Sequence, residues 1–405
     1  MTEKEYWLYL AKVKGMESGR RRVLLEMFGT PEEIYKAKEE TLRRIPLLED
    51  FHIGQLLMFR SIDYERELER INGMDIGFVT VDDKEFPERL RDIPDAPSFL
   101  FFRGELPAED VPSVAVVGSR KCSLYGREMC LKFSERLAQA GIHIISGMAA
   151  GVDGFAHRGA IGAGGKTTAV LGCGVDVCYP SQNRDIFDLL SKSKSSGLNK
   201  GLEMTLCTIG SEEGNGFGDE DINENGKENS QRLYGGIVSE YYPGDKALPY
   251  NFPQRNRIIS GLADILLVVE AGKKSGTFIT VDHALEQGRD IFAIPGRIGD
   301  KVSDGCNSLI KNGAGIATEP EDIIDELKKR YEVLLRAEKK RKKAAAIRLE
   351  GEERIVYEAL ELVPVQINDI AERSGMDCGR LSQVLIGLEL KGMIEEVGKN
   401  LYIRK

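Results

Sequence analysis

The chain has 405 residues, of which 41% are hydrophobic and 30% are charged. This length predicts two or three domains, and the composition predicts a soluble protein with a sizeable apolar core. The formal net charge of −9 argues against a generally basic nucleic-acid coat protein, whereas a local positive face stays compatible with DNA binding.

The first 75 residues are predicted to form a small helical domain. Apolar residues recur there at helical spacing, and the predicted helices span residues 6–13, 21–28, 31–37 and 51–64. The phrase KGMESGRRRVLLEMFG resembles a degenerate helix-hairpin-helix or SAM-like unit. Such a unit either contacts the DNA backbone or serves as a helical cap, and the sequence favours neither role. Charges scattered through the first 15 residues leave no apolar signal-peptide core, so no export signal is expected.

Residues 76–335 are predicted to form a Rossmann-like core. It begins with a connector, 76–110, that holds extended segments at 76–81 and 98–103. From 112 to 325, apolar runs alternate with amphipathic helices such as 126–140 and 280–287, which is typical of a doubly wound α/β domain with a parallel sheet. The predicted strands are Ser113–Val117, His143–Ser146, Thr167–Leu171, Gly236–Glu240, Ile265–Glu270 and Asp290–Ile294.

Three further segments follow from composition and pattern. Residues 191–233 are polar, then acidic and rich in Gly and Asn, which predicts a disordered insertion in the core. Residues 336–350 are predicted to be a basic linker. Residues 351–405 are predicted to form a winged helix, with helices at 353–361, 366–374 and 377–391 and a β-hairpin wing. Because the third helix carries few basic residues, a structural or protein-binding role is favoured over duplex reading.

The sequence predicts neither a membrane span nor a metal site. Its most apolar segment, 258–269, is interrupted by Ser260, Gly261 and Asp264 and is shorter than the roughly 20 residues that a span needs. The seven cysteines have no CxxC pair and no metal-ligand spacing, so free or buried thiols in a reducing cytosol are expected. We therefore expect a cytoplasmic protein without metal or other cofactor.

A first candidate binding loop follows the strand at 113–117. Gly118, Ser119 and Arg120 lie between this strand and a predicted helix, where backbone amides and the helix dipole favour anions. Gly118 would let a phosphate approach the backbone, Ser119 would donate a hydroxyl and Arg120 would add a charged fork. A tight turn without a ligand is the alternative.

Two other patterns in the core carry less weight. The string GAGGKTT at 162–168 is not a P-loop, because two residues instead of four precede the Gly-Lys pair and the strand follows the glycines. Asp153 and His157 are spaced to face each other on a helix. No nucleophile accompanies them, so a structural hydrogen bond is favoured over base catalysis.

A second and third group of residues complete the candidate site. Arg255, Asn256 and Arg257 precede the strand at 265–270, and two arginines with an amide suit contact with a polyanion. Tyr250 and Phe252 lie nearby and can stack on bases. Lys274, Ser275 and Gly276 then form another loop into a helix start.

These segments together resemble a known family more closely than any one of them alone. From Val114 to Ile316 the chain contains, in order, VGSR, SGMAAGVDGFAH, AVLGCGVDVCYPSQN, SEYYPG, FPQRNRIISGLAD, VVEAGKKSGTFIT, FAIPG and SDGCNSLIKNGA. This order closely resembles the Rossmann-like core of the DprA/Smf proteins. The resemblance covers roughly residues 80–325 apart from the insertion, and the predicted winged helix matches the tail of some members.

The resemblance implies a function and a set of contacts. Members bind single-stranded DNA during natural transformation, pass it to the recombinase RecA and form dimers, here through a candidate segment at 303–316. The implied DNA-contact residues are Gly118, Ser119, Arg120, Arg255, Asn256, Arg257, Lys274, Ser275 and Gly276. Two features depart from the family pattern: Ser181 stands where a basic residue often follows the Tyr-Pro pair, and the acidic insertion is long.

Two other functions compete with this one. The Rossmann variant also resembles nucleoside-monophosphate phosphoribohydrolases, whose PGGxGT loop is followed by a glutamate. Here Thr280 and Val281 occupy that stretch, which disfavours a nucleotide-hydrolysing enzyme. A duplex-reading regulator led by the winged helix is disfavoured by the sparse positive charge of its third helix.

Overall fold

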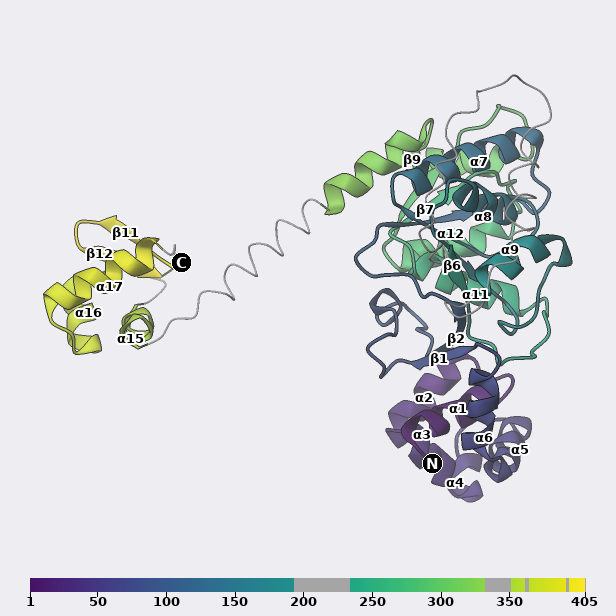
Figure 1. Cartoon of the computed structure of the whole chain (residues 1–405), viewed down its shortest axis with the longest axis horizontal. Helices are drawn as coiled ribbons and strands as arrows, with labels where there is room; N and C mark the ends of the chain where they lie inside the picture. The colour runs from purple at the N-terminus through teal and green to yellow at the C-terminus, as the bar shows by residue number, and fades with distance from the viewer. Residues whose placement is uncertain (193–233, 332–350, 361–363, 391–392, 405) are drawn as a thin grey trace, which may run out of the picture. The chain divides into compact units, whose positions relative to one another are not determined.

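The computed structural model describes residues 1–192, 234–331, 351–360, 364–390 and 393–404. They form two compact units, Met1–Lys328 and Lys329–Lys405 (Figure 1). The predicted linker at 336–350 lies outside the described residues, as does the predicted insertion except for Ser191 and Lys192. In the part of the chain that is described, none of the helices has the length and apolarity needed to cross a membrane.

The chain begins with a cluster of short helices. Thr2 and Thr30 cap two of them with their side chains, and Pro31 occupies the first turn of α3. The predicted helix at 51–64 is in fact α5 and a 3₁₀ turn, and α4 and α6 were not predicted. The helices are α1 (Glu3–Lys12), α2 (Ser18–Phe28), α3 (Pro31–Lys36), α4 (Glu39–Arg43), α5 (Asp50–Met58) and α6 (Tyr64–Asn72).

The larger unit is built on a nine-stranded sheet in the order β1-β2-β6-β5-β4-β3-β7-β8-β9. The seven strands from β6 to β9 are parallel, whereas β1 and β2 add antiparallel at one edge. The predicted connector therefore supplies two strands of the sheet. The strands are β1 (Gly77–Thr80), β2 (Phe99–Gly104), β3 (Ser113–Val117), β4 (His143–Ser146), β5 (Thr167–Val170), β6 (Gly235–Ser239), β7 (Ile265–Val268), β8 (Asp290–Ala293) and β9 (Gly315–Ile316).

The order of the strands creates a switch point between β3 and β7. From β3 the chain runs through β4 and β5 to β6 on one side, and from β7 it runs through β8 to β9 on the other. Because parallel crossovers are right-handed, the two series of helices cover opposite faces of the sheet. The first series is α7 (Leu124–Gln139), α8 (Val152–Gly162) and α9 (Arg184–Leu190), and the second is α11 (Asn251–Gly261), α12 (Thr277–Glu286) and α13 (Asp304–Lys311).

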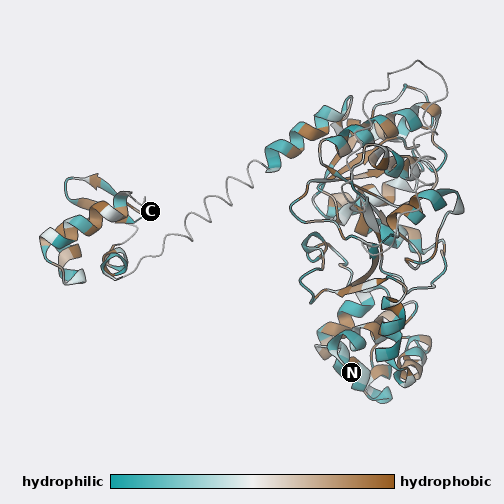
Figure 2. Cartoon of the chain, in the orientation of Figure 1, coloured by the Kyte–Doolittle hydropathy of each residue, from teal (hydrophilic) through white to brown (hydrophobic). Residues whose placement is uncertain are grey.

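Every residue of the strands β3, β4, β5, β6 and β7 is buried, which explains why none of these strands contains Asp, Glu, Lys or Arg. Hydrophobic residues concentrate in these strands and on the inner sides of the helices (Figure 2). One apolar cluster joins Trp7 and Leu56 of the N-terminal helices to Phe99, Phe101 and Tyr242 of the sheet region. The N-terminal helices thus share a core with the sheet in one compact unit.

The smaller unit is the predicted winged helix. Its helices pack around Val356, Ile370, Leu381 and Leu385, and its sheet has the order β10-β12-β11. The short strand β10 was not predicted. The elements are α15 (Glu352–Ala359), β10 (Val365–Gln366), α16 (Ile367–Ser374), α17 (Cys378–Leu390), β11 (Ile394–Gly398) and β12 (Leu401–Arg404).

Candidate nucleic-acid interface

A cavity of about 640 Å³ lies at the carboxyl ends of β3 and β7, at the switch point of the sheet. Ligands of open α/β folds bind at this place. Seven of the predicted site residues line it: Gly118, Ser119, Arg120, Arg255, Asn256, Ser275 and Gly276. Arg257 and Lys274 do not.

The loop after β3 is held by backbone bonds to its neighbours. Ser119 N–H donates to the Glu270 carbonyl at 2.8 Å, and the Ser119 carbonyl accepts from Val152 N–H at 3.2 Å. A Cβ on Gly118 would lie 2.7 Å from Val152 Cγ2 and 2.9 Å from the Glu270 carbonyl oxygen. Gly118 therefore serves the packing of this loop against α8 and Glu270, and the approach of a phosphate to it stays a prediction.

The N-terminus of α7 is satisfied within the protein. Ser123 caps it by accepting from Gly126 N–H at 3.1 Å, and the buried carboxylate of Glu270 accepts from both the Ser123 N–H and the Ser123 hydroxyl. Glu270 thus occupies a place where the sequence predicted an external anion. The exposed cations Arg120 and Lys121, on the preceding loop, remain available to a ligand.

Arg255 forms part of the floor of the cavity. Its side chain is buried, and its Nη1 donates to the Gly147 carbonyl at 2.7 Å and to the Val170 carbonyl. Burial lowers the pKa of Arg255 and raises the pKa of the neighbouring Asp153, and the attraction between the two opposes both shifts. The predicted contact with a polyanion requires Arg255 at the surface, whereas the residue is buried and its bonds tie α11 to the ends of β4 and β5.

Arg257 belongs to a different part of the molecule. Its Nη2 donates to Glu240 Oε2 at 2.7 Å and to Ser18 Oγ at 2.9 Å, and its residue is 3% exposed. The prediction that Arg255 and Arg257 share one surface groove is therefore wrong. The segment that carries them is α11, and residues two apart on an α-helix point about 200° away from each other.

Two aromatic rings form one wall of the cavity. Tyr179 and Phe252 stack with ring centroids 5.5 Å apart and an interplanar angle of 27°. The guanidinium of Arg120 lies 5.2 Å from the Phe252 ring centroid, within the range of a cation–π contact. Phe252 was proposed from the sequence, whereas Tyr179 was missed, although it lies in the string AVLGCGVDVCYPSQN that carries the family resemblance. Tyr179 is 48% exposed, so its ring is open to a ligand.

The loop after β7 contributes hydroxyl groups, and no charged side chain, to the lining of the cavity. The Ser275 hydroxyl lies 2.8 Å from Thr277 Oγ1 and accepts from Thr277 N–H at 3.2 Å. Gly276 is the N-cap of α12 and has no side chain, so the Ser275 hydroxyl, rather than a carboxylate, is the side-chain group bonded to the first turn of this helix. Lys274 is exposed on the same loop but lies outside the lining of the cavity.

Asp153 and His157 do not form the hydrogen bond that the sequence favoured. Asp153 accepts from Ala149 N–H at 3.3 Å, whereas His157 Nδ1 lies 2.7 Å from Thr167 Oγ1. Burial lowers the pKa of His157 to about 3, so the ring is neutral near pH 7. Both residues hold α8 in place, as a structural role requires, with separate partners.

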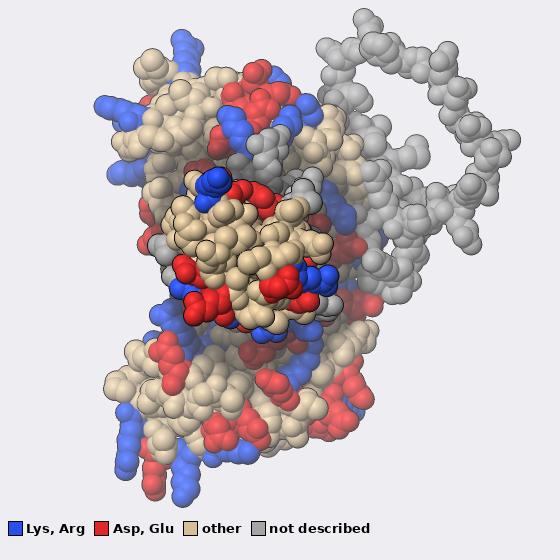
Figure 3. Space-filling view, turned by 90° about the vertical axis from the view of Figure 1, so that its left-hand side faces the viewer, with Lys and Arg blue, Asp and Glu red and all other residues tan. Residues whose placement is uncertain are grey.

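The charge of the surface drawn in Figure 3 and the placement of metal-ligating side chains are two further features of the molecule. On the face drawn in Figure 3, basic and acidic side chains are interspersed, and neither sign covers a large continuous area. Among the described residues, no group of three or more His, Cys, Asp or Glu side chains is placed to hold a metal ion. Asp153 is the one carboxylate among the described residues that line the cavity.

Known proteins resemble the chain over most of its length. The family model described as DNA recombination-mediator protein A matches residues 77–199 and 203–328, and the model described as DprA winged helix domain matches 340–398. The chain is 38% identical over 241 residues to DNA processing protein DprA of Streptococcus pneumoniae, covering 60% of this chain and 71% of that protein. It is 35% identical over 322 residues to protein Smf of Escherichia coli, covering 79% and 75%. The X-ray structure of DNA processing protein A from Streptococcus pneumoniae matches with a TM-score of 0.60 at 31% identity, over 80% of this chain and 98% of that one.

Proposed function

Because the chain belongs to the DprA/Smf family of DNA processing proteins, we propose that it binds single-stranded DNA, without catalysis, in the cavity at the switch point of its sheet. One observation carries the proposal: exposed Arg120 lies over Phe252, which stacks on exposed Tyr179. Cations beside open aromatic rings are the combination by which proteins hold unpaired bases and their phosphates.

The choice of single strands over duplexes rests on these rings. An aromatic side chain stacks on the face of an unpaired base, and a duplex hides that face within its own stack. The winged helix offers little to a duplex, because α17 contains one basic residue, Arg380, which is paired with Glu352 at 2.8 Å. Duplex recognition normally relies on several phosphate contacts.

The backbone of the strand would be held at the rim of the cavity. Arg120 and Lys121 supply charge, and the hydroxyls of Ser119 and Ser275 supply neutral donors. Arg255 would act from the floor by keeping the loops in place, since its donors are already bonded to Gly147 and Val170. Contacts of this kind read no base sequence, so the proposed binding has little sequence preference.

A hydrolytic function is disfavoured by the chemistry of the lining. Stabilising a ribosyl cation requires an ionised carboxylate near the reacting carbon, and Thr280 occupies the place expected for it on α12. Asp153 is buried in the lining beside Arg255, and burial raises its pKa. Such a group is a poor candidate for the missing charge.

The family resemblance extends the proposal to partners and cellular setting. We propose that the protein acts in the cytoplasm, protects incoming DNA and passes it to RecA in natural transformation. We also propose a homodimer through the segment 303–316, where Ile316 is 52% exposed on the edge strand β9. Light scattering tests the dimer, and a monomer at tens of micromolar would contradict it.

The central experiment compares single- and double-stranded DNA of equal length in titrations at several salt concentrations. The expected result is tighter binding of the single strand, with an affinity that falls linearly with salt on logarithmic axes. The rate at which RecA nucleates on the bound strand tests the proposed transfer, and faster nucleation is expected. Equal affinity for both forms of DNA would contradict the proposal.

A further inference from the structure

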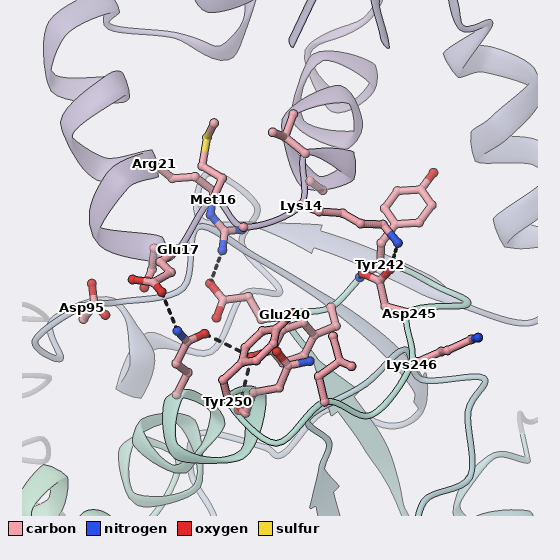
Figure 4. Close-up of a pocket in the computed structure, with 18 of the residues that line it drawn as sticks. Lys14, Met16, Glu17, Arg21, Asp95, Glu240, Tyr242, Asp245, Lys246 and Tyr250 are labelled. Carbon is pink, nitrogen blue, oxygen red and sulfur yellow. Dashed lines mark hydrogen bonds and ion pairs between the residues drawn. The ribbon is translucent and has the colours of Figure 1, made fainter. Parts of the chain in front are cut away.

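A second cavity, of about 340 Å³, lies between the N-terminal helices and the core (Figure 4). The turn between α1 and α2 forms one side, and the loop after β6 with the first turn of α11 forms the other. The volume is at the lower end of the range for small-molecule sites, which suits a ligand of nucleotide size. Its walls include three tyrosines, Tyr241, Tyr242 and Tyr250.

Most of the charges in this cavity are already paired. Glu240 accepts from Arg21 at 3.0 Å and from Arg257 at 2.7 Å, and Lys14 lies 2.8 Å from Asp245 (Figure 4). Arg21 is 7% exposed, and its Nε is a buried donor without a hydrogen-bond partner. Buried donors of this kind are rare in proteins. Because this atom has no surface open to the cavity, recognition of a ligand falls to the groups at the rim.

The rim carries the groups that remain open. Lys246 is exposed at the edge of the cavity, Tyr250 is 63% exposed and Leu248 is 39% exposed. An open phenol ring beside an apolar side chain suits the face of a base, and an exposed ammonium suits a phosphate.

The two cavities are neighbours separated by one stretch of chain. Leu248, Tyr250 and Gln254 line the second cavity, whereas Pro249, Phe252 and Pro253 line the first. The ridge between the cavities is therefore the first turn of α11 and the residues before it. A helix with its side chains is about 10–12 Å wide, so about three nucleotides at the stacked spacing of roughly 3.4 Å would cross it.

We infer that this cavity is a second nucleotide site, into which a single strand held in the first cavity continues over the start of α11. The inference rests on the proposed function of the first cavity. The base stacks on Tyr250, its phosphate lies at Lys246, and the α1–α2 turn closes the site from the other side. The N-terminal helices thereby take part in DNA binding through a pocket that they form jointly with the core.

The test uses the full-length protein with oligo(dA) of 4 and 12 residues and with free dAMP as probes. Removing the ring in Tyr250→Ala should weaken binding of the 12-mer about tenfold and leave the 4-mer unchanged. Tyr250→Phe should bind like the parent protein, because it keeps the ring. Lys246→Ala should lower the salt slope of the 12-mer by about 0.7. The matched control is Lys132→Ala, which removes an exposed lysine of α7 outside both cavities.

The outcomes separate this inference from the proposed function. If Arg120→Ala weakens both oligomers while Tyr250→Ala and Lys246→Ala change neither, the first cavity binds DNA and the second-site inference is overturned. If Arg120→Ala also has no effect, the proposed function fails with it. Binding of dAMP that depends on Tyr250, together with an unaffected 12-mer, would assign the site to free nucleotides and overturn the continuation of the strand.

Discussion

At the scale of single residues, Arg120 and Arg255 line the same cavity, but the side chain of Arg120 is exposed and that of Arg255 is buried. Replacing Arg120 should therefore affect DNA binding, and replacing Arg255 should affect folding stability. Arg120 is exposed, so Arg120→Ala should weaken single-strand binding by about 1–3 kcal/mol, lower the salt slope by about 0.7 and leave the melting temperature unchanged. Arg255 is 4% exposed, and Arg255→Ala leaves two buried carbonyls without their donor. This variant should lose about 2–4 kcal/mol of folding stability.

The comparison needs binding titrations and thermal unfolding of the same variants. Arg66→Ala is the matched control, because Arg66 is an exposed arginine of α6 that lines neither cavity. A stable Arg255→Ala protein, or an Arg120→Ala protein with unchanged affinity and salt slope, would contradict the assignment of these roles.

Two buried histidines make stability depend on pH. Burial lowers the pKa of His143 and of His157 to about 3, whereas an unfolded histidine titrates near pH 6.5. Below pH 6.5 the unfolded chain therefore binds protons that the folded chain excludes. Stability should fall with decreasing pH between about 6.5 and 3, by up to about 1.4 kcal/mol per pH unit for each histidine.

Trp7 is the single tryptophan and is buried in the shared core, so its fluorescence reports urea unfolding of the larger unit. His157→Gln should flatten the pH dependence by about one proton between pH 7 and pH 5. An unchanged slope would show that His157 is not excluded from protonation in the folded state.

The sequence predicted where the first cavity lies and seven of the residues that line it, but not the burial of Arg255 and Arg257. Apolar strands followed by glycine and polar residues placed Ser119 and Ser275 at one edge of the sheet, because parallel strands end together. Arginine is usually exposed, so Arg255 and Arg257 were expected at the surface. Their burial depends on acceptors from distant segments, Val170 and Glu240, which no local pattern reveals.

At the scale of elements, the backbone conformation of the loop between β4 and α8 requires a glycine. Gly151 has φ = +77°, and a Cβ there would lie 2.3 Å from the Ser119 carbonyl oxygen. Gly151→Ala should displace the loop that carries Arg120, cost about 1–3 kcal/mol of stability and weaken single-strand binding.

The control for Gly151→Ala is Gly162→Ala, in the last turn of α8. A Cβ on Gly162 would meet no atom within 4 Å, and alanine is the better helix former, so this variant should be neutral or slightly stabilised. Melting temperatures and oligonucleotide titrations of the two variants test the pair. Equal behaviour of both variants would contradict the role of Gly151.

Six of the seven parallel strands were predicted within two residues, because strands buried on both faces are rich in apolar residues. The short edge strand β9 was not predicted. The antiparallel edge was not predicted. β1 and β2 were taken for a connector, since their place in the sheet depends on pairing between β2 and β6, more than 130 residues apart. Short elements such as α4 and β10 lack the length over which a period becomes visible.

At the scale of the whole molecule, both cavities belong to the unit Met1–Lys328. A chain ending at residue 331 should therefore bind a single-stranded 12-mer within about twofold of the full-length affinity, since no residue that lines either cavity is removed. Titrations of both proteins, with circular dichroism to check folding, measure this. A loss of more than tenfold from a folded truncated protein would show that the winged helix or the segment before it contributes to DNA binding.

The ion pair between Arg21 and Glu240 joins residues 219 positions apart in the chain. A ribosome adds about 5–20 residues per second, so Arg21 waits roughly 10–40 s for its counter-ion after it is made. A guanidinium without that partner stays hydrated rather than buried. The N-terminal helices are therefore synthesised first but cannot complete this contact until β6 and Glu240 have been made, and until then the side of α2 that carries Arg21 stays open to solvent and to chaperones.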